Sequence, residues 1–315
     1  MEALAALGAV DFLMWVVTGI STGLTQGFSI QLSQYYGAKD FENLRKSLAH
    51  SYRLTAFIAV GVFILSQSFA ALVLTGLHTP SNIIGMSLLY LRIIFCGIPA
   101  TAAYNMFAAA LRAMGNSKTP LTAMIIASVL NVSLDILFVA GFGWGVAGAA
   151  IATVIAQSFS AVYCFLILRR IDIVHLTRAD FMPASGMNAR LMKLGIPVVF
   201  QNIIIGVGGL VVQYVINGYG FLFVAGFTAT NKLYGLLEMA AISYGYAIVT
   251  YVGQNLGAGK IDRIKKGVRS SMLLSLLTSL IISAAMFLFG KNILSLFISG
   301  EPQQTQQVLA IAFKY

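Results

Sequence analysis

The stretch Gln34-Tyr35-Tyr36-Gly37-Ala38-Lys39-Asp40-Phe41-Glu42-Asn43-Leu44-Arg45-Lys46 recurs 220 residues later as Gln254-Asn255-Leu256-Gly257-Ala258-Gly259-Lys260-Ile261-Asp262-Arg263-Ile264-Lys265-Lys266. Four positions are identical, and each copy follows a Gly-containing apolar segment and opens a basic turn. Six apolar segments separate the starts of the two preceding segments. An even number leaves both copies in the same orientation, which is typical of parallel repeats related by an axis along the membrane normal. The repeat unit is therefore predicted to have six helices.

Composition indicates a membrane protein. The 315 residues are 58% hydrophobic and 10% charged, and the mean hydropathy is +0.86, whereas soluble domains carry roughly a quarter of their residues as charges. The apolar runs are long and nearly continuous, so helices satisfy their backbone groups better than barrel strands would. The fold class expected is an all-α polytopic membrane protein with eight full spans, at 7–33, 48–75, 84–111, 121–142, 144–168, 193–217, 224–252 and 268–290.

The repeat predicts where these spans belong in a larger design. A ninth span starts near Val308 and is cut at Tyr315. In a twelve-helix, two-lobe molecule the chain would supply the second to the ninth helix and the start of the tenth. The expected domains are an N-lobe at 1–168 that lacks its first helix, an inter-lobe loop at 169–192, and a truncated C-lobe at 193–315.

Basic residues predict the orientation. Sixteen of the 20 Lys and Arg fall in alternate gaps between spans, and the opposite gaps hold only Lys291. Cytoplasmic loops are enriched in Lys and Arg, so we expect the basic gaps, including 169–192, to face the cytoplasm of a bacterial inner membrane. The net charge of +10 is explained by topology, and a nucleic-acid partner is not expected.

Ionisable residues inside a membrane need a partner, water or a function. Asp135 is the strongest, since Asn131 lies four residues earlier on the same helical face. Such a carboxylate could take up a proton, ligate a small cation such as Na⁺ together with Asn131, or hydrogen-bond within the bundle as a structural link. Glu238 could bind a cationic substrate or meet Lys232 through water. Asp11 and Arg92 lie nearer span ends and are interpreted as structural.

The chain offers no sign of an enzyme or of an ATP-driven pump. The three His residues fall at loops or span ends, and no nucleophile and base pair is expected. No phosphate-binding loop occurs, and energy would have to come from an ion gradient. We expect no cofactor beyond H⁺ or Na⁺ as the coupling ion.

The residues that carry a family resemblance run in order along the chain: Glu2 to Gly8, Gln34-Tyr35-Tyr36-Gly37-Ala38, Leu111-Arg112-Ala113-Met114-Gly115-Asn116-Ser117-Lys118-Thr119-Pro120, Asn131, and Gly145 to Thr153. Together they resemble the multidrug and toxic compound extrusion (MATE) family, in its bacterial NorM and DinF-like branches. The resemblance implies two six-helix lobes and export of amphipathic, often cationic, drugs in exchange for H⁺ or Na⁺. It implies a coupling site at Asn131, Asp135 and Thr153.

By the same resemblance, Asn105 and Gln157 are weaker candidates for the wall of the substrate cavity, as are Glu238 and Lys232 in the C-lobe. The first hypothesis is therefore a secondary antiporter in which Asp135 takes up the coupling ion. The alternatives are a lipid-linked precursor flippase of the same superfamily, or an inactive truncated fragment of the transporter. Three acidic intramembrane residues against two basic ones favour cationic cargo. The partners expected are small drug-like molecules and membrane lipid, and a monomer is expected.

Overall fold

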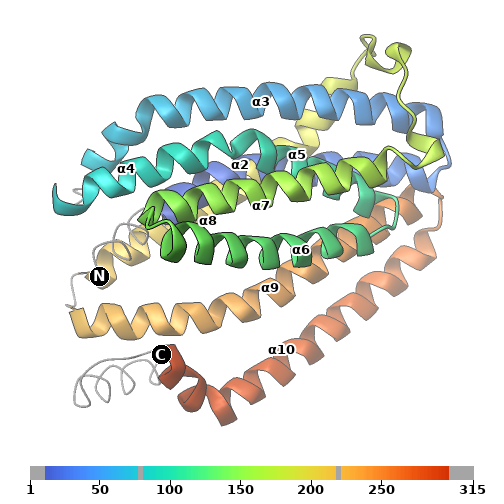
Figure 1. Cartoon of the computed structure of the whole chain (residues 1–315). Coiled ribbons are helices and arrows are strands. Elements are labelled where there is room, and N and C mark those ends of the chain that lie inside the picture. The colour runs from blue at the N-terminus through green and yellow to red at the C-terminus, as the bar shows by residue number, and fades with distance from the viewer. Residues whose placement is uncertain (1–10, 77–80, 218–220, 298–315) are drawn as a thin grey trace.

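The computed structural model describes residues 11–76, 81–217 and 221–297, and within them it is all-helical, as the sequence predicted. Figure 1 shows long helices lying side by side. The helices in chain order are α2 (Asp11–Gly37), α3 (Phe41–Gly76), α4 (Ser81–Cys96), α5 (Ile98–Ala113), α6 (Lys118–Asp135) continued by the π-helix η1 (Ile136–Gly141), α7 (Gly145–Leu168), α8 (Met187–Asn217), α9 (Phe221–Gly257) and α10 (Ile261–Phe297).

Several of these helices can cross a membrane. Within the described residues, five are long and apolar enough, and α4 with α5 adds a sixth if the bent pair counts as one span. The chain is a multi-pass membrane protein, while the number of eight spans stays a prediction. The start of a ninth span near Val308 lies outside the described residues.

The predicted span 84–111 is two helices bent by 44°. The break falls at Gly97, and Pro99 occupies the first turn of α5, where its missing N–H leaves no helical hydrogen bond unmade. A Cβ at Gly97 would lie 2.8 Å from Cγ2 of Val154 on α7. The bend therefore has a backbone cause at Pro99, which the sequence shows, and a packing cause at Gly97, which it does not.

Helix α2 is the central element, and it contacts α3, α5, α8 and α9. It buries five polar side chains, Ser21, Thr25, Ser29, Gln31 and Ser33, while apolar side chains of outer helices such as Phe57 and Phe287 are exposed. Exposed apolar faces suit contact with lipid. Polar groups in the middle of the bundle can bond to one another or to neighbouring backbone, which lipid does not allow.

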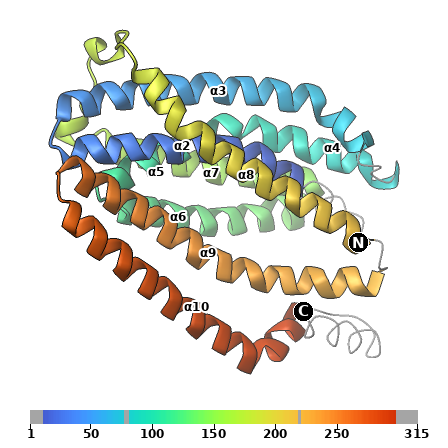
Figure 2. The same cartoon turned by 180° about the vertical axis from the view of Figure 1, so that it is seen from behind.

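Three glycines spaced four apart let α8 pack closely across α2 (Figure 2). A Cβ at Gly27 would lie 2.3 Å from the Cα of Gly195, and one at Gly23 would lie 2.9 Å from the Cα of Val199. Beside Gly19, the Asn202 amide donates a 3.0 Å hydrogen bond to the Gly19 carbonyl. Small residues at this spacing allow the backbone approach that drives helix association in membranes.

The repeated sequence forms the same turn twice. In the first copy the N–H groups of Ala38, Lys39 and Asp40 donate to the carbonyls of Gln34, Tyr36 and Tyr35, and residues 258–260 donate to 254, 256 and 255 in the same pattern. The left-handed residue falls at equivalent positions, with φ of 58° at Lys39 and 69° at Gly259. The sequence repeat therefore corresponds to a repeat of backbone structure.

The two copies also touch one another. A Cβ at Gly37 would collide with the Gln254 carbonyl, and one at Gly257 would collide with the Gln34 carbonyl. These contacts exchange under the 220-residue repeat. The equivalent positions Ser33 and Gly253 also face each other, since a Cβ on Gly253 would lie 2.7 Å from that of Ser33. A pseudo-two-fold axis therefore passes between α2 and α9 at this point.

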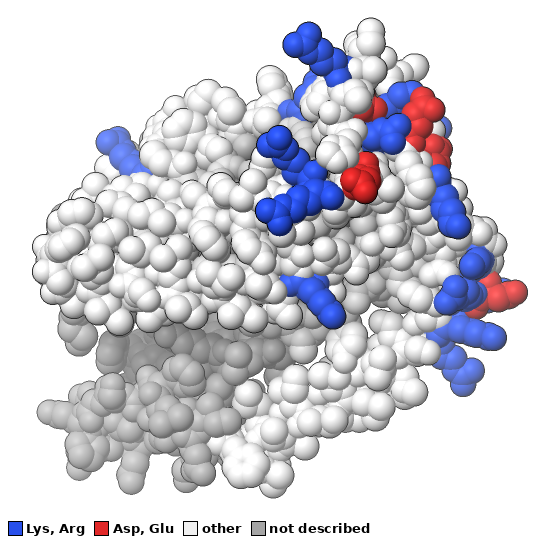
Figure 3. Space-filling view, turned by 45° about the vertical axis from the view of Figure 1, so that its right-hand side comes forward, with Lys and Arg blue, Asp and Glu red and all other residues white. Residues whose placement is uncertain are grey.

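The turns that carry the repeat lie at the same end of the bundle as residues 169–186 between α7 and α8. Lys and Arg gather at this end in Figure 3, and we call it the basic end. The segment includes two short 3-10 turns, η2 (Asp172–Val174) and η3 (Arg178–Phe181). The connection between α7 and α8 is folded against the bundle, where η2 and η3 contact α3.

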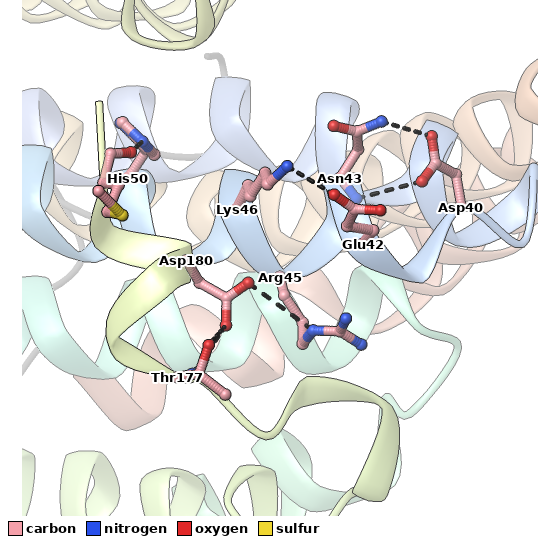
Figure 4. A network of polar contacts seen from close by, with 9 residues as sticks. Asp40, Glu42, Asn43, Arg45, Lys46, His50, Thr177 and Asp180 are labelled. Carbon is pink, nitrogen blue, oxygen red and sulfur yellow. Dashed lines mark hydrogen bonds and ion pairs between the residues drawn. The ribbon is translucent and has the colours of Figure 1, made fainter. Parts of the chain in front are cut away.

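Side chains of α3 hold this connection in place (Figure 4). Asp180 is buried, accepts hydrogen bonds from the backbone and hydroxyl of Thr177, and lies 3.8 Å from the Arg45 guanidinium. His50, 1% exposed, donates from Nε2 to the Met182 carbonyl at 3.1 Å. Its Nδ1 lies 2.7 Å from the side-chain oxygen of Asn188 on α8. The start of α8 is thus fastened to α3.

Candidate functional site: a polar cavity between α5, α6 and α7

A cavity of about 180 Å³ opens between α5, α6 and α7. Its polar lining comes from Tyr104, Ser128, Asn131, Thr153, Gln157 and Ser160, and Met124, Ala127 and Ala156 complete it. A liquid water occupies about 30 Å³, so the cavity has room for a few waters or a hydrated ion. Drug-sized ligands need about 300 Å³ or more, so this cavity suits an ion better than a drug.

The cavity side of α6 is one helical face. Met124, Ala127, Ser128 and Asn131 follow the spacing of a single stripe, and the same stripe reaches Asp135 one turn later. Val129 and Ile136, on other sides of the helix, are exposed. Apolar side chains therefore face outward while the polar stripe faces α7.

Two predicted coupling residues meet in this cavity. The Asn131 amide nitrogen lies 3.5 Å from the Thr153 hydroxyl, which itself donates a 3.0 Å hydrogen bond to the Ala149 carbonyl one turn earlier on α7. The long Asn131–Thr153 separation marks a weak contact. Both side chains thus keep capacity to bind water or an ion.

Asp135 lies one turn beyond the cavity and is not among its lining residues. Its Oδ1 is shielded from solvent, and no hydrogen-bond partner for it occurs in the described part of the chain. Seventeen residues separate it from Lys118 at the basic end, a rise of about 26 Å. The carboxylate therefore sits in the half of the span away from the basic end.

Asp135 is also the last α-helical residue before the π-helix η1. The wider π turn is uncommon and is often found at functional sites. Phe138 of this π-helix stacks on Trp144 and on Phe142, the residue that follows it, with ring centroids 5.1 Å and 6.0 Å apart. Phe142 and Trp144 pack in a tilted arrangement at 5.3 Å. The residue with the shielded Oδ1 is therefore followed directly by a π-helical segment, beside which the three aromatic rings pack.

The remaining predicted site residues separate into three groups. Gln157 lines the cavity. Asn105 is outside the lining and donates a 3.2 Å hydrogen bond to Thr22 of α2. Glu238 is half-buried on α9 and not part of this cavity, and the side chain of Lys232 lies outside the described residues.

Within the described residues no group of three or more His, Cys, Asp or Glu could hold a metal ion.

Sequence reasoning missed three polar lining residues, Tyr104, Ser128 and Ser160. Ser128 could have been found, because it lies three residues before Asn131 and seven before Asp135 on the same stripe. Tyr104 and Ser160 depend on how α5 and α7 are rotated against α6, which no local pattern specifies.

A helical membrane bundle with an internal pseudo-two-fold axis and a polar cavity defines a class of transporter-like folds. The sequence model of the MatE family matches residues 1–137 and 197–315. The chain belongs to this family, as the motifs predicted.

Named relatives are bacterial. The chain is 31% identical to "Probable multidrug resistance protein YpnP" of Bacillus subtilis (strain 168), covering 100% of the chain and 71% of the relative. It is 27% identical to "Probable multidrug resistance protein YoeA" of the same organism, covering 96% and 67%. The "Multidrug export protein MepA" of Staphylococcus aureus (strain NCTC 8325 / PS 47) is 22% identical, covering 91% and 63%. The chain thus spans about two thirds of these relatives.

Solved structures share the fold. "Outward-facing conformation of a multidrug resistance MATE family transporter of the MOP superfamily" superposes with a TM-score of 0.88 at 20% identity, covering 99% of this chain and 72% of that one. A MOP superfamily transporter from Pyrococcus furiosus, with a title that reports reverse polarity of its binding pocket, gives a TM-score of 0.90 at 20% identity, covering 99% and 69%.

Proposed function

We propose that the protein exports amphipathic cations across a bacterial inner membrane in exchange for H⁺ or Na⁺, and that the coupling ion binds at Asp135, Asn131 and Thr153. Membership of the MatE family and relatives named for multidrug resistance support the export of drugs. The observation that carries the ion site is the shielded, unpartnered Oδ1 of Asp135, one turn from the Asn131–Thr153 contact.

The chemistry follows from the cost of a charge in a membrane. An ionised carboxylate without a partner is expensive in hydrocarbon, so Asp135 gains stability when a proton or a cation neutralises it. Amide and hydroxyl oxygens at Asn131 and Thr153 can replace part of the hydration shell of Na⁺, and waters in the cavity can supply the rest. Loading the site from the side opposite the basic end would then favour one conformation of the bundle over the other.

In this proposal the basic end faces the cytoplasm, and the six-helix repeats act as two lobes that alternate around the pseudo-two-fold axis. Residues 1–168 and 193–315 are the lobes, and 169–192 is the cytoplasmic connection. A monomer suffices, since the repeat supplies both sides of the pathway.

The test is efflux of a fluorescent cation such as ethidium from proteoliposomes, under a pure pH gradient and then a pure sodium gradient. Asp135→Asn should abolish gradient-driven efflux while the protein stays monodisperse. Asp172→Asn is the matched control, because it removes the same charge from a fully exposed side chain and should leave efflux unchanged. Undiminished efflux in Asp135→Asn under both gradients would refute the assignment of the site.

A further inference from the structure

A side-chain bridge joins the two halves of the chain near the basic end. The Arg112 guanidinium, in the last turn of α5, lies over the Tyr246 ring of α9, with Cζ 4.9 Å from the ring centroid. Next to it, the Gln254 amide donates a 2.8 Å hydrogen bond to the Ala113 carbonyl. These two contacts tie α5 to α9 beside the reciprocal glycine contacts of the repeat.

Arg112 has an aromatic partner and no acidic one. Within the described residues none of the ion pairs includes Arg112. The titratable groups that act on it are Tyr246, Tyr104 and Cys164, none of which is a carboxylate. The attraction of its charge to the ring face of Tyr246 is therefore the specific interaction that holds the guanidinium there.

The proposed function requires a surface that accepts organic cations, and an aromatic face is one. Tyr246 is half-buried and lies eight residues, about 12 Å along α9, from Glu238. An amphipathic cation on this ring would gain the contact that Arg112 now makes. Ring and guanidinium cannot meet while another cation covers the same face.

Resting on the proposed function, we infer that Tyr246 is a recognition residue for the cationic cargo and that Arg112 is its intramolecular competitor. Cargo that arrives from the basic end displaces Arg112 from the ring. That displacement removes the Arg112–Tyr246 contact between α5 and α9 and leaves the Gln254–Ala113 hydrogen bond in place. Cargo binding thereby weakens the contact between α5 and α9 at the basic end, which couples the binding of cargo to the opening of that end.

The inference predicts a specific pattern of affinities. A ligand that must displace an internal group binds with lower affinity, because only the fraction of molecules in which the binding surface is free can accept it. Arg112→Met keeps an unbranched aliphatic stem and removes the guanidinium, so it should tighten binding of tetraphenylphosphonium about three- to tenfold, which is the range expected for one partly desolvated cation–π contact. Tyr246→Phe should bind like the wild type, and Tyr246→Leu should bind more weakly.

The decisive measurement is equilibrium binding of radiolabelled tetraphenylphosphonium to detergent-purified protein without any gradient. Lys118→Met removes an exposed positive charge from the same end and should leave the affinity unchanged. In a Tyr246→Leu background Arg112→Met should give no gain, because the contested ring is gone.

If Arg112→Met still raises the affinity in the Tyr246→Leu background, the effect is relief of charge repulsion and the inference is overturned. An unchanged or weaker affinity in Arg112→Met alone would overturn it as well. Wild-type protein that binds no cation would instead refute the cargo class of the proposed function. The two failures are therefore distinct. Size-exclusion profiles and thermal midpoints of each variant show that it is folded.

Discussion

The closest backbone contact between α2 and α8 makes a quantitative prediction about Gly27. A Cβ there would meet the Cα of Gly195 at 2.3 Å, the Gly195 nitrogen at 2.6 Å and the Leu194 carbonyl oxygen at 2.6 Å. Carbon atoms in van der Waals contact need about 3.5 Å or more, so Gly27→Ala forces the helices apart by roughly 1 Å. All three atoms belong to the backbone, and no side-chain rotation can relieve the clash.

The expected cost is at the upper end of the range for an overpacked core, about 2–3 kcal/mol, because the stripe around Gly19, Gly23 and Gly27 separates as a unit. In a protein of this size that amounts to a fall of about 5 °C in the thermal midpoint, measured by tryptophan fluorescence in detergent.

Gly61 provides the control, because a Cβ there would meet nothing within 4 Å. Gly61→Ala should be neutral or raise stability by up to about 1 kcal/mol, since Ala is the better helix former. If the thermal midpoints of Gly27→Ala and Gly61→Ala are both at or above the wild-type midpoint, the close-packed interface between α2 and α8 is refuted.

Three further predictions concern other parts of the chain. Thr153→Val should slow gradient-driven efflux roughly tenfold, as loss of a supporting group does at other ion sites. Ser158→Ala on the same helix should leave efflux unchanged. Equal efflux rates in the two variants would contradict a role for the Thr153 hydroxyl. Asp180→Ala removes the buried carboxylate that accepts two hydrogen bonds from Thr177, at about 1–3 kcal/mol, and should speed proteolysis within 169–186. Wild-type cleavage rates would show that the connection is not held there. Lys39→Gly should stabilise the protein by about 1 kcal/mol, because the left-handed conformation at this position strains a Lys. The second copy of the repeat already has Gly259 at the equivalent position. An unchanged or lower thermal midpoint would contradict that strain.

Patterns with a fixed period were readable from the sequence. Helical class follows from apolar runs of spanning length, and the four-residue spacing of Asn131 and Asp135 puts them on one face whatever surrounds them. The 220-residue repeat predicted equivalent turns, and the matching hydrogen bonds at residues 38–40 and 258–260 confirm it. Each of these inferences needs only local geometry.

Features that depend on how helices are rotated and docked could not be read in the same way. The close approach of Val154 to Gly97 at the bend involves a residue far away in sequence. The burial of His50 depends on the segment around Met182 folding back onto α3. Arg112 and Tyr246 come from different halves, and only the packing of α5 on α9 brings them together.

The reciprocal contact around Gly37 and Gly257 has a consequence for how the molecule could be assembled. An interface in which each side presents the same short sequence to the other is self-complementary, so each half of the chain carries, in its own copy of the turn, a surface that recognises the other copy. Co-expressed but unlinked halves should therefore find each other through these turns, with the peptide between them serving mainly to keep the pair at one-to-one proportion.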